Sequence, residues 1–288
     1  MCAAGHPATE EQAADRPAPA EAPSIALVGH ERMPLLLVPG AFSSGDDFEP
    51  MASWFYASGW DSRVVRLPAR ARRVPQLDRG GLAAIDAMLD EAVAACKEPP
   101  VVVGHSLGGL ATLRLSRRTQ LPAAVLLTPA TPYGLAPHLL RTGVRDPLTA
   151  MKFGALATAA PLARAVPLGP PAGLFTPAAS RDVVRRSLAH RVSESWLVLA
   201  QLLVGDPTPQ PPADQPTLVL GGTLDTLAPP ASVRQLADDL TADYVERVVG
   251  HAFYEEPALD AIAAEVDAWL RRVGVVPATG RAERRRYR

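Results

Sequence analysis

The chain has 288 residues, 48% of them hydrophobic, and its 29 lysines and arginines almost balance its 30 acidic residues. The resulting net charge of −1 argues against the basic surface of a nucleic-acid-binding protein. The two cysteines, Cys2 and Cys96, cannot build a disulfide framework. No apolar stretch reaches the about 18 residues expected of a membrane span.

Both ends of the chain are predicted to be solvated tails. Residues 1–23 are rich in Ala, Pro, Glu and Asp and lack the basic-then-apolar order of a secretory signal. We therefore expect a disordered N-terminal tail and a cytoplasmic protein. Residues 275–288 are predicted to form a basic C-terminal tail.

Between the tails, short apolar strands alternate with helices. This order is typical of a mostly parallel central sheet with helices on both faces, whose binding crevice lies at the carboxyl ends of the strands. The predicted strands are Leu35–Val38, Ser62–Leu67, Val101–Val103, Ala124–Leu127, Thr217–Leu220 and Tyr244–Val248. The predicted helices include Leu82–Ala95, a helix after Ser106, Val233–Leu240 and Ala258–Leu270.

The alternation stops between residues 132 and 214, where prolines punctuate several predicted helices and no clear strand appears. A structureless loop of that length is implausible in a compact domain. We therefore predict a helical cap at 132–214 inserted into an α/β core formed by 24–131 and 215–274. Apolar cap residues either pack on the sheet or line the substrate pocket. The pocket candidates are Met151, Phe153, Phe175 and Trp196.

The sequence Gly104-His105-Ser106-Leu107-Gly108 lies between a β-branched strand and a helix-forming stretch. This order of strand, sharp turn and helix gives the G-x-S-x-G motif its meaning, because the turn exposes the serine at the carboxyl end of a strand. Small residues at Gly104 and Gly108 let the strand and helix approach closely. The pattern predicts that Ser106 is a nucleophile rather than a surface-turn serine.

A nucleophilic serine needs a histidine base and a carboxylate that orients it. Of the six histidines, His251 follows a predicted strand and precedes the last helix, so it is expected at the active edge. Asp225 occupies the equivalent place after the strand that ends at Gly221-Gly222. The alternatives are a structural loop histidine and a turn or helix-capping aspartate.

The oxyanion hole is expected to consist of two backbone N–H groups. The first belongs to Leu107, which follows the nucleophile. The second comes from the loop after the first strand, with Ala41 as the first choice and Phe42 as the second.

Four motifs together resemble the α/β-hydrolase superfamily, most closely its capped esterase and lysophospholipase-type members. They are Leu-Leu-Val-Pro-Gly-Ala-Phe, Val-Gly-His-Ser-Leu-Gly-Gly, Gly-Gly-Thr-Leu-Asp-Thr-Leu-Ala-Pro-Pro and Val-Gly-His-Ala-Phe-Tyr, and the resemblance spans roughly residues 25 to 273. The order Ser, Asp, His along the chain is also that of the superfamily. In place of the His-Gly that many members carry before the oxyanion residue, this chain has Pro39-Gly40.

The resemblance implies a serine hydrolase that cleaves a carboxylic ester or thioester of a medium-sized apolar substrate through an acyl-enzyme, with no cofactor and no metal. One alternative is a tailoring enzyme of secondary metabolism, either a thioesterase or a lyase in which His251 removes a proton while an acyl group such as acetate departs. A non-catalytic receptor is a further alternative. The arginine-rich loop, with Arg66 and four arginines between 70 and 79, is expected to be an ordinary surface loop, although an anionic group such as phosphopantetheine would suit it.

Overall fold

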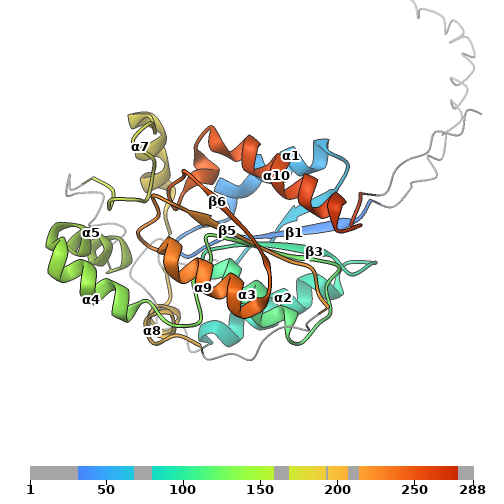
Figure 1. Cartoon of the computed structure of the whole chain (residues 1–288), viewed down its shortest axis with the longest axis horizontal. Coiled ribbons are helices and arrows are strands. Elements are labelled where there is room, and N and C mark those ends of the chain that lie inside the picture. Colours follow the sequence, from blue (N-terminus) through green and yellow to red (C-terminus); the bar gives the residue numbers. More distant parts are fainter. Residues whose placement is uncertain (1–31, 68–79, 159–168, 193, 207–213, 278–288) are drawn as a thin grey trace, which may run out of the picture. The chain divides into compact units, whose positions relative to one another are not determined.

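Six parallel strands form one sheet in the order β2-β1-β3-β4-β5-β6 (Figure 1). The computed structural model describes residues 32–67, 80–158, 169–192, 194–206 and 214–277. The predicted tail at 1–23, residues 278–288 and the arginines between 70 and 79 lie outside the described residues. The fold class predicted from the sequence is confirmed, and every described strand pair is parallel.

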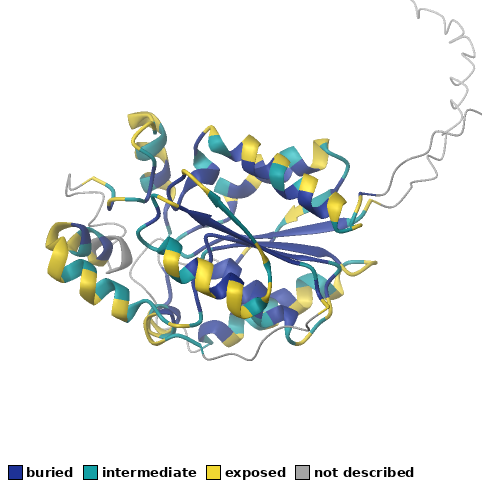
Figure 2. Ribbon diagram, viewed as in Figure 1, coloured by how far each residue is buried: buried dark blue, intermediate teal, exposed yellow. Residues whose placement is uncertain are grey.

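The central strands consist of apolar residues because both faces of the sheet are covered. Every residue is buried in β1 (Pro34–Val38), β3 (Val101–His105), β4 (Ala124–Leu127) and β5 (Thr217–Gly222). The edge strands β2 (Asp61–Val64) and β6 (Asp243–Arg247) are partly exposed, which matches their polar sequences. Figure 2 shows this contrast as a buried centre with mixed edges.

Alternate residues of each strand point to opposite faces of the sheet. Leu35 and Leu37 pack in the cluster that includes α1 (Glu49–Ala57) and α10 (Ala258–Arg272). Leu36 and Val38 pack on the opposite face with α2 (Gly81–Ala94) and α3 (Leu107–Ser116). On that second face, α9 (Pro230–Leu240) has its own apolar cluster against Leu126 and Val219.

Between β4 and β5 the chain forms helices, as predicted, and the described residues there contain no strand. They include α4 (Ala136–Arg145), α5 (Pro147–Thr158), α7 (Arg181–His190) and α8 (Trp196–Val204). Figure 1 shows these four helices gathered at one end of the sheet. Within the described residues, no helix is both long and apolar enough to cross a membrane.

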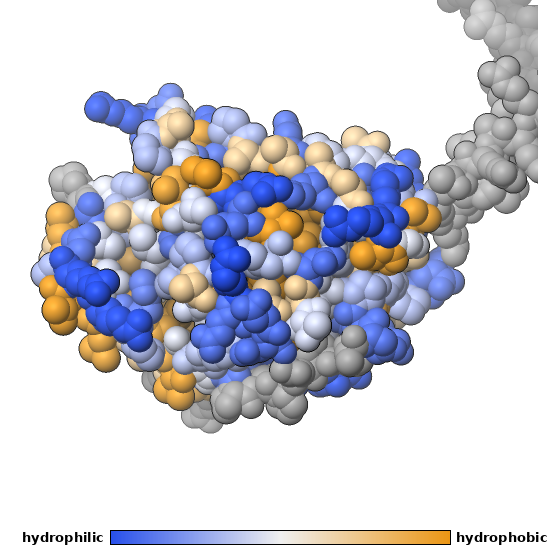
Figure 3. Space-filling view, in the orientation of Figure 1, coloured by the Kyte–Doolittle hydropathy of each residue, from blue (hydrophilic) through white to orange (hydrophobic). Residues whose placement is uncertain are grey.

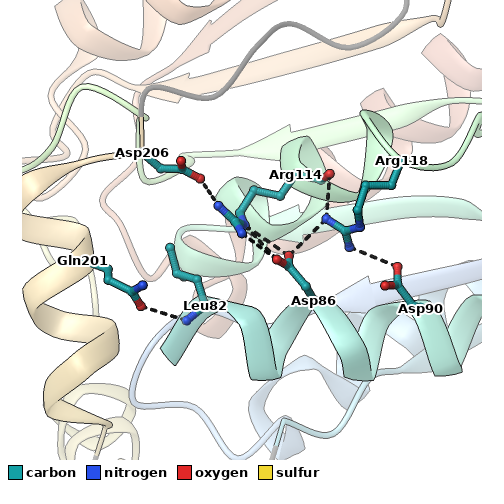
Figure 4. A network of polar contacts seen from close by, with 7 residues as sticks. All are labelled: Leu82, Asp86, Asp90, Arg114, Arg118, Gln201 and Asp206. Atoms are coloured by element: carbon teal, nitrogen blue, oxygen red, sulfur yellow. Dashed lines mark hydrogen bonds and ion pairs between the residues drawn. The ribbon is translucent and has the colours of Figure 1, made fainter. Parts of the chain in front are cut away.

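A polar network fixes the end of this segment to the helices beneath the sheet (Figure 4). Arg114 of α3 pairs with Asp86 of α2 at 2.6 Å and also with Asp206, which follows α8. The Oε1 atom of Gln201 accepts the N–H of Leu82 at 2.8 Å, so a side chain of α8 satisfies a free donor in the first turn of α2. The network therefore ties α8 to α2, and it ties the residue Asp206 after α8 to α3, the helix that follows Ser106.

Candidate active site

Ser106 stands at the apex of the turn between β3 and α3. Its backbone has φ 52° and ψ −117°, a conformation that side-chain-bearing residues rarely adopt. Three hydrogen bonds hold it: Ser106 N donates to Leu127 O at 3.1 Å, and Ser106 O accepts from Leu110 N at 3.1 Å and Ala130 N at 2.9 Å. Strain of this kind persists only where the surroundings enforce it, and it is typical of functional sites.

The glycines around the turn have no room for a side chain. A Cβ atom on Gly108 would lie 2.1 Å from Val38 O, and one on Gly104 would lie 2.2 Å from Gly108 O. Both neighbours are backbone atoms of the sheet or helix and cannot move aside cheaply. The close approach predicted for these two glycines is what positions Ser106.

We expect Gly108→Ala to lower the free energy of unfolding by about 3 kcal/mol, the upper end of the range for overpacking. The reason is the clash with Val38 O, which would force α3 away from β1. Urea unfolding measures the change. Gly154→Ala is the matched control, since nothing lies within 4 Å of a Cβ there and alanine favours the helix. Equal stabilities of the two variants would contradict this account.

Asp225 and His251 meet at the carboxyl ends of β5 and β6. The Nδ1 atom of His251 lies 2.7 Å from Oδ2 of Asp225, and both side chains are buried. The other carboxylate oxygen, Oδ1, accepts the N–H groups of Leu227 at 2.8 Å and Ala228 at 2.9 Å. Because a carboxylate only accepts, Nδ1 carries the proton and Nε2 of His251 is left as an acceptor. That tautomer is the one a general base needs.

The structure thus brings two of the three predicted triad residues into hydrogen-bond contact. Ser106 lies at the same edge of the sheet, and its hydroxyl makes no hydrogen bond with another described residue. Catalytic hydrogen bonds often form only in the complex with substrate, so a free hydroxyl is compatible with a nucleophile.

His105 is a residue of the site that the sequence analysis did not assign. Its Nε2 atom lies 2.8 Å from the carbonyl oxygen of His251, and the two imidazole rings are 4.8 Å apart between centroids. A carbonyl oxygen only accepts, so Nε2 of His105 carries the proton. Burial holds the pKa of His105 well below its usual value, so the ring is neutral. His105 therefore fixes the backbone of His251 without adding charge.

Residues 172–176, from the stretch between α5 and α7, touch both loops that carry the pair. Gly173 O accepts the N–H of His251 at 2.9 Å, and Leu174 O accepts the N–H of Ala252 at 2.7 Å. On the other side, the hydroxyl of Thr226 donates to Ala172 O. The strip of residues 172–176 therefore holds the Asp225 loop and the His251 loop in fixed positions relative to each other.

The predicted oxyanion loop lies directly beside Ser106. A Cβ atom on Gly40 would be 3.0 Å from Cβ of Ser106. Within the described residues, the N–H groups of Ala41 and Leu107 donate no hydrogen bond. The N–H of Phe42, in contrast, donates to Oε2 of Glu194 at 3.4 Å.

Phe42 is bound at both its polar backbone groups by the segment before α8. Its carbonyl oxygen accepts the N–H of Val192 at 2.9 Å, and Glu194 accepts its N–H. Glu194 is buried, and its other oxygen accepts the N–H of Ser195 at 2.8 Å. Phe42 itself has φ 63°, so these contacts also stabilise a strained residue.

The four predicted pocket residues differ in how far they are buried. Phe153 and Phe175 are buried, and Phe175 packs in the apolar cluster beneath α1 and α10. Trp196 is the first residue of α8 and is partly exposed, whereas Met151 is 52% exposed on α5. Arg66, the described member of the arginine-rich loop, pairs with Asp46 and Glu49 at the surface.

A buried ion pair anchors the loop after His251. The Nη2 atom of Arg191 lies 2.8 Å from Oε1 of Glu255, and the hydroxyl of Ser187 donates to the same oxygen at 2.6 Å. Burial raises the pKa of the Glu255 carboxyl. Since Glu255 ends the 3-10 helix Phe253–Glu255 (η2), this pair ties α7 to the region of the base.

The sequence pattern of the alpha/beta hydrolase family matches residues 35–265 of this chain. No curated protein matches the chain significantly. Among solved structures, MenH from S. aureus is similar with a TM-score of 0.59 at 18% identity, covering 84% of this chain and 94% of MenH. The enol-lactonase from Burkholderia xenovorans LB400 gives a TM-score of 0.59 at 18% identity, covering 84% and 92%. The monoacylglycerol lipase from Paleococcus ferrophilus gives 0.57 at 18% identity, covering 83% and 94%. At these identities the similarity shows a shared fold and nothing more.

Proposed function

Because the chain belongs to the alpha/beta hydrolase family, we propose that it is a serine hydrolase that cleaves a carboxylic ester or thioester of an apolar substrate. Ser106 is the nucleophile, His251 the general base and Asp225 its orienting acid. The observation that carries this proposal is the 2.7 Å contact between His251 Nδ1 and Asp225 Oδ2, at the same sheet edge as the strained Ser106 turn. Two proteins of similar fold, the enol-lactonase and the monoacylglycerol lipase, are named as enzymes that cleave esters. Their names support an ester as the substrate.

In the proposed reaction, Nε2 of His251 takes the proton of the Ser106 hydroxyl as the oxygen attacks the carbonyl carbon. His251 then gives this proton to the departing alcohol or thiol, leaving an acyl-enzyme. Water then attacks the acyl carbon while His251 takes one of its protons. The bond from the acyl carbon to the Ser106 oxygen breaks, His251 returns the proton to that oxygen, and the carboxylic acid leaves. Asp225 stabilises the imidazolium formed in each half, and its own charge is held by the N–H groups of Leu227 and Ala228.

For the oxyanion hole, we propose the N–H groups of Leu107 and Ala41. Leu107 is the first residue of α3, where the N–H has no acceptor within the helix and the helix dipole favours negative charge. Ala41 is favoured over Phe42 because the N–H of Phe42 is already bound to Glu194. Glu194 is then a positioning residue, since it fixes the residue next to the donor.

The segment 132–214 is proposed to serve as the cap over this site. Phe175 belongs to the strip bound to the His251 loop, and Trp196 follows Glu194 closely, so both remain candidates for the pocket wall, together with the buried Phe153. Met151 stays a weaker candidate because more than half of it is exposed.

The test is turnover of short p-nitrophenyl esters together with labelling by a fluorophosphonate. We expect hydrolysis and a single adduct that mass spectrometry maps to Ser106. A protein that turns over no ester or thioester and forms no adduct would refute the proposal. With an acylated substrate, an alkene product in place of an alcohol would support the eliminating alternative instead.

We expect Glu194→Ala to lower kcat by about tenfold to a hundredfold with little change in KM, because a misplaced donor loses part of the about 3 kcal/mol that one oxyanion contact supplies. Glu194→Gln keeps one acceptor oxygen for the two N–H groups of Phe42 and Ser195 and replaces the other oxygen by an NH₂ donor, so it should recover only part of the activity. Steady-state kinetics on one ester measures both, with the exposed Glu98→Ala as control. An unchanged kcat in the alanine variant, or a loss that appears in KM and not in kcat, would count against this role.

A further inference from the structure

Two large apolar side chains of the helix α4 are exposed to solvent. None of its residues is buried, and Leu140 and Val144, one turn apart on the same side, are 72% and 85% exposed. On the other side of the helix, Nε2 of His138 lies 2.5 Å from the carbonyl oxygen of Thr226, and Thr142 contacts the same nitrogen at 3.3 Å. In a surface helix of a globular domain, large apolar side chains ordinarily face the core.

Exposed apolar residues are found on α5 as well. Leu148 and Met151 are each 52% exposed, whereas Thr149 and Phe153 of the same helix are buried. We call the four exposed residues Leu140, Val144, Leu148 and Met151 the apolar ridge. In Figure 3 the edge of the molecule over α4 and α5 shows hydrophobic and strongly hydrophilic atoms side by side. Contiguous exposed apolar surface of this kind marks a binding surface.

The charged residues on these two helices are mainly basic. Arg141 and Arg145 are exposed on α4, and Lys152 lies on α5, against one carboxylate, Asp146. The local charge is therefore positive, although the whole chain carries −1. Hydrogen bonds from Thr149 hold the pKa of Asp146 below its usual value, and its carboxylate caps the first turn of α5.

This charge pattern distinguishes between two partners that could bind the apolar ridge, a second copy of the chain and a lipid layer. In a symmetric dimer the same surface meets itself, so the arginines Arg141 and Arg145 of both copies would gather their positive charge at one interface. Anionic lipid headgroups, in contrast, pair with the arginines while the ridge enters the boundary of the acyl chains. We propose that the apolar ridge binds the surface of an anionic lipid layer, with α4 lying in the plane of that layer.

This binding is independent of the proposed catalysis, so it is tested on the full chain carrying Ser106→Ala. Co-flotation is measured with vesicles of phosphatidylcholine alone and with about 30% phosphatidylserine. We expect binding to the anionic vesicles, at least tenfold stronger than to the neutral ones, and weakened by salt. Binding to neither vesicle, or equal binding to both, would overturn the proposal.

Two further variants locate the contact. Leu140→Gln with Val144→Gln is expected to weaken anionic-vesicle binding at least tenfold, and Arg141→Gln with Arg145→Gln about 25-fold, at about fivefold per basic residue. Val248→Gln, another highly exposed valine, is the matched control and should bind unchanged. The basic C-terminal residues are the same in all variants, so undiminished binding of the ridge variant would overturn the proposal. A dimer that only the ridge variant loses, without vesicle binding, would assign the surface to a second copy instead.

Discussion

Ser106→Ala is expected to lower kcat for ester hydrolysis by about 10⁶-fold, the loss found when a serine protease loses its nucleophile. Without the hydroxyl there is no acyl-enzyme, and only binding and the oxyanion donors remain to accelerate attack by water. Labelling by the fluorophosphonate should disappear completely. The substrate should still bind, because the change removes one atom and no pocket residue.

The same variant also separates catalysis from folding. The three backbone hydrogen bonds of Ser106 involve only its N–H and carbonyl groups, so alanine can keep them and the turn. We therefore expect thermal unfolding close to that of the wild type. Ser232→Ala, on α9 away from the site, is the control and should retain full activity. Residual turnover of the Ser106→Ala variant above one-tenth of the wild type would contradict its role as nucleophile.

The parts of the structure that the sequence predicted well are those with a local pattern. The runs Leu35-Leu36-Leu37-Val38 and Val101-Val102-Val103 are buried strands because no polar residue interrupts them. Asp225 and His251 each follow a strand, and because parallel strands bring their carboxyl ends to one edge, the two side chains come into contact. Strand ends were predicted less well: the second strand stops at Val64, although Leu67 was predicted to end it.

The contacts that complete the site have no local pattern. His105 and His251 are 146 residues apart, and Phe42 and Glu194 are 152 residues apart, so nothing near either residue points to its partner. No sequence pattern points to the strip at 172–176 either, because it binds the two loops through the carbonyl groups of Ala172, Gly173 and Leu174, and every residue has such a group. For α4, the spacing of apolar residues indicates an amphipathic helix but does not say which side faces the protein.

Asp225→Asn is expected to lower kcat by about 10⁴-fold while the fold stays intact. The backbone explains why so small a change has so large an effect. Oδ1 of Asp225 accepts two N–H groups, from Leu227 and Ala228, so the amide oxygen of an asparagine must stay on that side. Its NH₂ group then faces Nδ1 of His251. Two donors cannot share that contact, so the proton moves to Nε2 and His251 can no longer accept the proton of Ser106.

Kinetics with one ester, combined with the nitrogen NMR signals of His251, check this prediction. The wild type should carry its proton on Nδ1 and the variant on Nε2. The exposed Asp238→Asn is the matched control and should leave both kcat and the tautomer unchanged. A variant within tenfold of wild-type activity would remove Asp225 from the triad. Labelling distinguishes this residue from the nucleophile: Asp225→Asn keeps the Ser106 hydroxyl and should react slowly with the fluorophosphonate, whereas Ser106→Ala should not react at all.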